Sequence, residues 1–172
     1  MFNRFGASGT IHIMPDGSID PPSALDYSDM MFTRSINGGN AWSMPIRLND
    51  DVTSNDQFFP AIVVDPVGRI KVAWYDRRLD LGNRYIDVFL VKSSDGGSSF
   101  RPNVRVTDVS FDPVNPFYGD FAFIGDYIDI DASTERTYPI WTDRRNGNND
   151  IYVDGPPREH DLSVSLEAPT RN

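Results

Sequence analysis

Short hydrophobic runs alternate with turn-forming residues along the chain, and no stretch keeps a helical period. Between positions 70 and 75, Ile, Val and Trp alternate with Lys, Ala and Tyr, the period of two that places successive side chains on opposite faces of a sheet. Asp65–Gly68 supplies turn residues before this run. Glycines 96 and 97 suit the positive φ of a tight hairpin. The runs at 62–64, 70–75, 87–91 and 103–106 predict four antiparallel strands in about 55 residues.

This pattern is repeated. The segment 35–42 (SINGGNAW) returns 58 positions later as 93–100 (SSDGGSSF), and 74–78 (WYDRR) returns 67 positions later as 141–145 (WTDRR). The two offsets differ by nine residues, which places an insertion between 108 and 141, most of it in the Pro-rich stretch 110–120. Four-stranded units repeated at this period are typical of β-propeller blades, so we predict an all-β propeller fold.

The chain contains about three such blades within a single domain, 1–172. Their predicted bounds are about 10–50, 57–108 and 121–154, followed by a tail at 155–172 in which residues 162–166 alternate as a further strand would. The first blade lacks a clear first strand, and the third lacks the segment found at 35–42 and 93–100. A ring needs about four to eight blades. We therefore expect either part of a longer propeller or self-association that closes a six-bladed ring from two copies.

The repeated segment resembles the Asp-box (BNR) repeat, Ser-X-Asp-X-Gly-X-X-Trp/Phe, of the sialidase (neuraminidase) superfamily. The second copy fits every fixed position, and the first departs from it once, with Asn37 in place of Asp. The resemblance implies that each box is a structural turn between the third and fourth strands of a blade, and that the protein is extracellular or at the cell surface. The box residues are Ser35, Asn37, Gly39 and Trp42, and Ser93, Asp95, Gly97 and Phe100.

Composition excludes several classes of protein. Without cysteine there are no disulfides, thiol nucleophiles or thiolate metal sites. A net charge of -9 argues against a nucleic-acid partner, which requires clustered Lys and Arg. No apolar run approaches the roughly 20 residues of a membrane span, and residues 1–10 lack the apolar core of a signal peptide.

Strand order predicts that the box turns lie at one end of the blades and the loops after 76 and 143 at the other. The second end carries two arginine doublets, Arg77–Arg78 and Arg144–Arg145, which we predict as ligand-binding residues. Resemblance to sialidases implies arginines that grip a substrate carboxylate, as guanidinium groups do in bidentate fashion. The alternative is that each doublet anchors its own loop.

Resemblance to sialidases also implies a tyrosine nucleophile, a glutamate that activates it and an aspartate acid/base. The candidates are Tyr118 (or Tyr127), Asp120 and Asp126. Only Glu135, Glu159 and Glu167 could supply the glutamate, and the first falls at the box end while the others lie in the tail. This inventory speaks against catalysis by this chain alone.

The sequence predicts no metal site. Asp120, Asp126, Asp129 and Asp131 offer oxygen ligands of the kind Ca²⁺ takes, but their spacing matches no calcium motif. Two histidines, at 12 and 160, are too few for zinc. Aromatic residues of the insertion, Phe111, Phe117 and Tyr118, could stack on sugar rings or pack the loop.

Three functions remain open. The leading prediction is a non-catalytic module that binds a carbohydrate or small acidic ligand. The second is a fragment of an exo-sialidase-type glycoside hydrolase. The third is a structural or protein-interaction repeat, since a propeller fold by itself specifies no activity.

Overall fold

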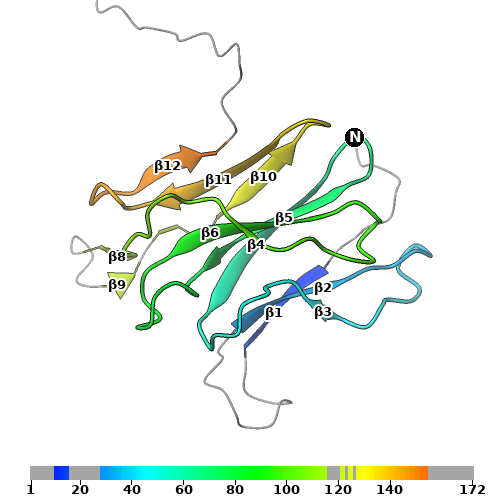
Figure 1. The fold of residues 1–172 in the computed structure, drawn as a ribbon, viewed down its shortest axis with the longest axis horizontal. Coiled ribbons are helices and arrows are strands. Elements are labelled where there is room, and N and C mark those ends of the chain that lie inside the picture. The colour runs from blue at the N-terminus through cyan, green and yellow to red at the C-terminus, as the bar shows by residue number, and fades with distance from the viewer. Residues whose placement is uncertain (1–9, 16–27, 116–120, 123, 126, 155–172) are drawn as a thin grey trace, which may run out of the picture.

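The computed structural model describes residues 10–15, 28–115, 121–122, 124–125 and 127–154. These form three antiparallel sheets that lie side by side, with a fourth, two-stranded sheet beside them (Figure 1). The first sheet contains β1 (Thr10–Pro15), β2 (Ser28–Thr33) and β3 (Ile46–Arg47). The second contains β4 (Gln57–Val64), β5 (Ile70–Asp76), β6 (Asp87–Ser93) and β7 (Val104–Arg105). The third contains β10 (Asp129–Ala132), β11 (Thr137–Asp143) and β12 (Asp150–Val153).

We call these sheets blades 1, 2 and 3. Each is a meander in which consecutive strands pair, with the register Val72↔Val91 between β5 and β6, for example. Each box precedes the last strand of its blade, at 35–42 between β2 and β3 and at 93–100 between β6 and β7, which correspond to the third and fourth strands of a complete blade. The insertion forms the small sheet of β8 (Val114–Asn115) and β9 (Phe121–Ala122). The tail strand expected at 162–166 and the candidates Tyr118, Asp120 and Asp126 lie outside the described residues.

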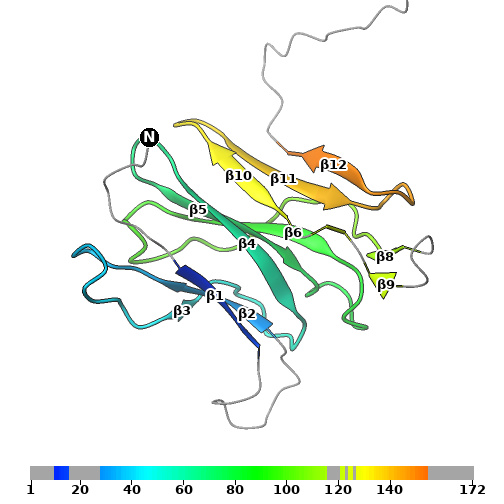
Figure 2. The ribbon, with the colours of Figure 1, turned by 180° about the vertical axis from the view of Figure 1, so that it is seen from behind.

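Blade 2 is the middle layer and is covered on both faces, as the view from behind also shows (Figure 2). Every residue of β5 is buried. One face of β5 carries Ile70, Val72 and Trp74, which pack against Met30 and Phe32 of blade 1. The other face carries Ala73 and Tyr75, which pack against Ile130 and Trp141 of blade 3. Because both faces are apolar and covered, the core runs through blade 2 rather than under a single surface.

A hydroxyl joins blades 2 and 3. The Tyr75 Oη accepts a hydrogen bond from the Thr142 backbone N–H at 3.0 Å and donates to the Thr142 carbonyl oxygen at 3.2 Å. Burial raises the pKa of Tyr75 to about 12, so this hydroxyl stays neutral and fills both roles. The Tyr75 hydroxyl thereby satisfies the backbone N–H and carbonyl of Thr142, which are partly buried where β11 meets blade 2 and therefore require partners.

Phe111 belongs to this core as well. Its side chain is 1% exposed, its ring centroid lies 6.3 Å from that of Tyr75, and its backbone exchanges two hydrogen bonds with Ile86. The sequence leaves two roles open for Phe111, stacking on a sugar ring or packing the insertion. It packs the insertion, because a ring that is 1% exposed has no free face for a sugar.

Candidate functional site

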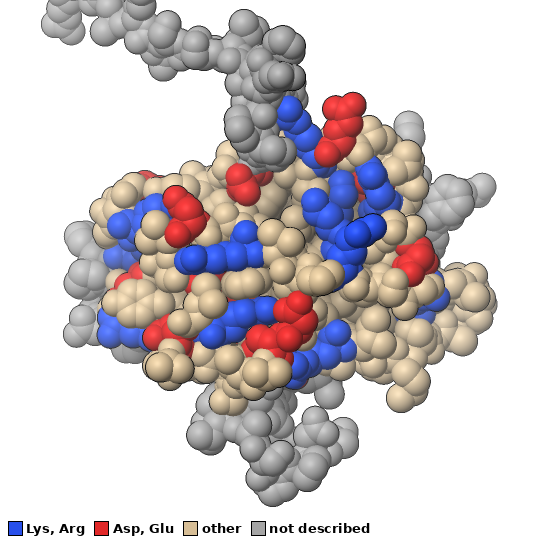
Figure 3. Space-filling view, viewed as in Figure 1, with Lys and Arg blue, Asp and Glu red and all other residues tan. Residues whose placement is uncertain are grey.

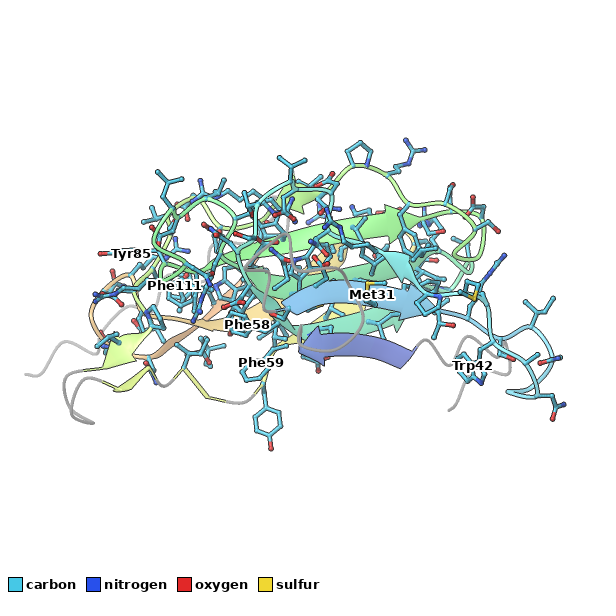
Figure 4. The ribbon with its side chains drawn as sticks, turned by 90° about the horizontal axis from the view of Figure 1, so that it is seen from below. Met31, Trp42, Phe58, Phe59, Tyr85 and Phe111 are labelled. Carbon is cyan, nitrogen blue, oxygen red and sulfur yellow. The ribbon has the colours of Figure 1, made fainter. Side chains whose placement is uncertain are left out.

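Loops from both ends of the blades hold polar clusters, and aromatic side chains gather mainly at one end. Figure 4 shows Phe58, Phe59, Phe111 and Tyr85 at the end opposite the box turn that carries Trp42. We call the end that carries Tyr85 and Phe111 the loop end, and the end that carries Trp42 the box end. The loop end includes the arginine doublets, as strand order predicts.

The repeated WxDRR segment builds the same arrangement in two blades. In blade 2, the carboxylate of Asp76 accepts from Trp74 Nε1 at 2.8 Å and from Arg78 Nε at 2.9 Å. In blade 3, Asp143 accepts from Trp141 Nε1 and from Arg145 Nε, each at 3.1 Å. The indole and the second arginine of the doublet are thus held by one fully buried carboxylate, which explains why the three residue types recur together.

The second arginine of each doublet also reaches the preceding blade. Arg78 donates to Asp50, which follows β3 of blade 1, at 2.7 Å. Arg145 donates to Asp108, which follows β7 of blade 2. The pKa of Arg145 is raised by its hydrogen bond to Asp143, and its guanidinium lowers the pKa of Asp108. We call these two contacts, Asp50–Arg78 and Asp108–Arg145, the interblade ion pairs.

The first arginine of each doublet has a different set of partners. Arg77 donates to Asp56 Oδ2 at 3.2 Å and lies over the ring of Phe58, 5.0 Å from its centroid. Arg144 donates to Asn149 Oδ1 at 2.7 Å and to the Gly147 carbonyl oxygen at 2.9 Å. Within the described residues the Nε of both arginines is buried without a hydrogen-bond acceptor. All four arginines therefore engage groups of the chain itself, and their role as a ligand clamp stays a prediction.

An irregularity in β4, the first strand of blade 2, places two aromatic rings at the loop end. The β4–β5 register shifts between Phe58 and Ala61, and Phe59 has a φ of 51°. Positive φ is a rare and strained conformation for a bulky side chain. As a result both Phe58 and Phe59 contact the ring of Tyr75, with centroids 5.5 and 6.2 Å away, although consecutive residues of a regular strand face opposite sides. Neither the bulge nor the strain has a signal in the sequence.

The segment just before the first strand of blade 3 adds a third ring. Tyr127 is 83% exposed, and the next residue, Ile128, packs in the same cluster as Phe59. β4 and β10 are neighbours in the fold, and Ile128, just before β10, packs in one cluster with Phe58 and Phe59 near the start of β4. We call Phe59 and Tyr127 the inner aromatic pair. Phe59 is half-buried and Tyr127 is exposed, and both lie near the start of a strand that begins at the loop end.

The calcium hypothesis rests on four aspartates, of which Asp129 and Asp131 are described and are exposed. Each accepts a hydrogen bond from the backbone N–H of the residue that follows it. No group of three or more His, Asp or Glu side chains able to hold a metal ion occurs within the ranges that the structure describes. In those ranges there is also no helix of the length and hydropathy that crossing a bilayer requires.

The two boxes form matching turns. Ser35 Oγ donates to Asn37 Oδ1 at 2.9 Å, and Ser93 Oγ donates to Asp95 Oδ1 at 2.8 Å. Each serine Oγ also accepts from the backbone N–H of the second glycine, at 2.9 Å in both copies. Asn37 accepts from a backbone N–H as Asp95 does. The single departure in the first copy therefore leaves the turn intact.

The aromatic residues that end the boxes differ in their surroundings. Phe100 packs edge-on against Phe32 of blade 1, with ring centroids 5.0 Å apart. Trp42 remains 42% exposed and lines a surface cavity with Ile36 and Ala41. Phe100 contacts the blade that precedes its own, and the described residues contain no blade that precedes the one carrying Trp42.

Comparison with known proteins shows similarity at the level of fold. No protein-family model matches the chain, and no curated protein matches it. A high-resolution structure of the Penicillium chrysogenum alpha-L-arabinanase complexed with arabinobiose is similar to it, with a TM-score of 0.57 and 17% sequence identity. The similarity covers 89% of this chain and 48% of the arabinanase chain, so this chain spans about half the length of that protein. The finer assignment to the sialidase superfamily stays a prediction, and the chain has the all-β, propeller-type fold that its repeats predict.

Proposed function

We propose that this chain is a carbohydrate-binding propeller module, and that its ligand stacks on the inner aromatic pair, Phe59 and Tyr127. The observation that carries the proposal is the strained backbone of Phe59. A positive φ at a phenylalanine is maintained only where surrounding structure enforces it, and such positions concentrate at binding sites. The faces of sugar rings present C–H groups, which pack on exposed aromatic rings.

The similarity to a solved arabinanase with bound arabinobiose supports a glycan as the ligand class, although the likeness itself concerns the fold. The loop end also offers hydrogen-bonding groups, among them the carboxylate of Asp129. A small number of polar groups beside aromatic rings is the usual composition of a carbohydrate or small-molecule site.

A glycan array probed with the wild-type chain and with Tyr127→Ala tests this proposal. Tyr127 is largely exposed, so the variant is expected to fold normally. We expect its affinity for bound glycans to fall about five-fold or more, the change that corresponds to a lost contact of about 1 kcal/mol. Tyr85→Ala is the matched control, because Tyr85 is an exposed tyrosine of the same end whose ring lies beside Arg84, ahead of β6, and is not part of the inner aromatic pair. Equal binding by both variants would contradict the proposal.

A second candidate, the glycoside hydrolase fragment, is favoured by the arabinanase likeness and by the arginine doublets. It predicts turnover of a fluorogenic arabinoside or sialoside, and loss of that turnover in Arg77→Ala and Arg144→Ala. Binding without turnover supports the non-catalytic module. Turnover that both arginine variants retain would remove the carboxylate clamp from the hydrolase hypothesis.

A further inference from the structure

A second surface, at the box end, has features of a binding site that the carbohydrate proposal does not use. A pocket of about 240 Å³ lies between blade 2 and the turn that joins β10 to β11. Figure 3 shows Lys and Arg side chains gathered at this end of the molecule. The pocket lining includes four cationic residues, in a protein whose net charge is -9: Arg69, Lys71, Lys92 and Arg101.

Two of these cations face each other across neighbouring strands. Lys71 of β5 and Lys92 of β6 are direct cross-strand partners. Like charges in this position destabilise a sheet. Burial and the charges of Lys71 and Arg69 lower the pKa of Lys92. A bound anion would remove this repulsion.

Two of the four cations, Arg69 and Lys71, are already paired with a carboxylate of the protein. Asp65 has no exposed side-chain surface and bonds Arg69 Nε at 2.6 Å and Lys71 Nζ at 3.2 Å. Burial alone would raise the pKa of Asp65, but hydrogen bonds from Arg69, Lys71 and backbone N–H groups outweigh it and lower the pKa to about 2. Asp65 is therefore charged near neutral pH and is committed to these two residues.

The other two cations, Lys92 and Arg101, have no such carboxylate partner among the described residues. The Arg101 backbone N–H donates to the Lys92 carbonyl oxygen at 2.9 Å, which fixes the two residues side by side. Glu135 also lines the pocket. Four cations then face two carboxylates, Asp65 and Glu135, which leaves a surplus of two positive charges.

A buried hydroxyl provides an independent indication of a ligand. Thr137, at the start of β11, lines the pocket and is only 7% exposed. Its Oγ1 is buried and has no hydrogen-bond partner among the described residues. An unsatisfied buried hydroxyl is costly and calls for an explanation, such as a ligand that accepts its hydrogen bond.

We propose that this pocket binds a sulfate or phosphate group, held by the ammonium of Lys92, the guanidinium of Arg101 and the hydroxyl of Thr137. All three are donors, and oxyanions accept such charge-assisted hydrogen bonds. The volume is below the roughly 300–1,000 Å³ of sites for drug-sized ligands, which suits a single charged substituent. The site lies at the opposite end of the blades from the inner aromatic pair, so it stands or falls independently of the proposed function.

Isothermal titration calorimetry at low ionic strength tests the proposal, with inorganic sulfate and inorganic phosphate as probes. We expect saturable binding that Lys92→Gln and Arg101→Gln each weaken roughly ten-fold or more, the usual effect of losing one hydrogen bond to a charged group. Thr137→Val should weaken binding less than either. Glu135→Gln should strengthen it, because the variant removes the carboxylate that competes with the ligand.

Arg84→Gln is the matched control, since Arg84 is an exposed arginine of the loop between β5 and β6, paired with Asp112. It should bind the anions as the wild-type chain does, and so should Tyr127→Ala. Glucose 6-sulfate compared with glucose and with sulfate then separates the sources: tighter binding of the ester indicates a sulfated sugar, and equal binding indicates the free anion. No saturable binding, or equal binding by Lys92→Gln, Arg101→Gln and Arg84→Gln, would overturn the proposal.

Discussion

The hydroxyl of Tyr75 is the most informative single group in the blade 2–blade 3 contact. It satisfies both backbone groups of Thr142, while its ring packs against Phe58, Phe59 and Phe111. A phenylalanine at this position would keep the ring packing and lose only the oxygen. Substitution therefore separates the hydrogen bonds from the hydrophobic contribution.

We expect Tyr75→Phe to lower the free energy of unfolding by about 1–2 kcal/mol, because it leaves the partly buried backbone N–H and carbonyl of Thr142 without their partner. Urea unfolding monitored by fluorescence measures the change. Tyr85→Phe is the control, since Tyr85 is 43% exposed and its oxygen has no comparable role; its effect should stay within about 0.5 kcal/mol. Indistinguishable midpoints for the two variants would show that water replaces the tyrosine oxygen at Thr142.

At this scale the sequence predicts residue types better than partners. The repeated Trp, Asp and Arg of the WxDRR segment leaves loop anchoring open as the alternative to ligand binding, and in the structure the carboxylates of Asp76 and Asp143 bond the second arginine of each doublet. The second partners, Asp50 and Asp108, lie 28 and 37 positions away, and no local pattern selects them. The strain at Phe59 and the missing partner of Thr137 arise only from packing, so the sequence could not reveal the inner aromatic pair or the anion pocket.

At the scale of elements, the two box turns require glycine for different reasons. In the first box the backbone conformation alone requires it, and in the second the lack of space for a side chain requires it as well. Gly39 and Gly97 hold equivalent positions with φ of 90° and 80°. A Cβ on Gly97 would lie 2.7 Å from two ring carbons of Phe32, whereas one on Gly39 would meet nothing within 4 Å. The second box therefore sits directly on blade 1, and its glycine serves both the turn and the blade contact.

We expect Gly39→Ala to destabilise the protein by about 1 kcal/mol, the order of the cost of a positive φ for a side chain. Gly97→Ala should cost about 1–3 kcal/mol more, because the added methyl group overpacks the contact with Phe32. Thermal unfolding of the two variants, measured side by side, gives the difference directly. Equal losses would mean that Phe32 moves aside without cost, and that the box contact is loose.

The strand pattern was predictable because each strand carries its own alternation and each turn its own glycine or aspartate. The box position between the third and fourth strands followed from the same order. The sheet formed by β8 and β9 was not foreseen, because two-residue strands have no periodicity to detect. The burial of Phe111 was also undecided, since its partners Tyr75 and Ile86 lie in blade 2, at least 25 positions before it in the sequence.

At the scale of the whole molecule, blade 2 is covered by blades 1 and 3, whereas blades 1 and 3 themselves expose large apolar side chains. Blade 1 exposes Trp42 and Met44, and blade 3 exposes Ile151 and Val153 by 74% and 61%. Phe100 shows what such a position does when a neighbour is present, because it packs on the preceding blade. Exposed apolar faces of this kind favour association.

We expect the chain to self-associate, with blade 3 of one copy against blade 1 of another. Light scattering over a concentration series should give twice the mass of one chain if two copies close a ring. Ile151→Asp should shift the mass toward one chain, while Leu81→Asp, a control in a fully exposed loop residue, should leave it unchanged. A wild-type chain that stays at the mass of one copy at every concentration would contradict the prediction.

The interblade ion pairs also bear on the order of events during synthesis. In each pair the carboxylate is made first and the guanidinium 28 or 37 residues later. At the roughly 5–20 residues per second of translation, Asp50 waits about 1 to 6 seconds for Arg78. Blades 1 and 2 thus emerge from the ribosome before the guanidinium that pairs with the carboxylate at their end, so nascent chains arrested before Arg78 or Arg145 lack that ion pair.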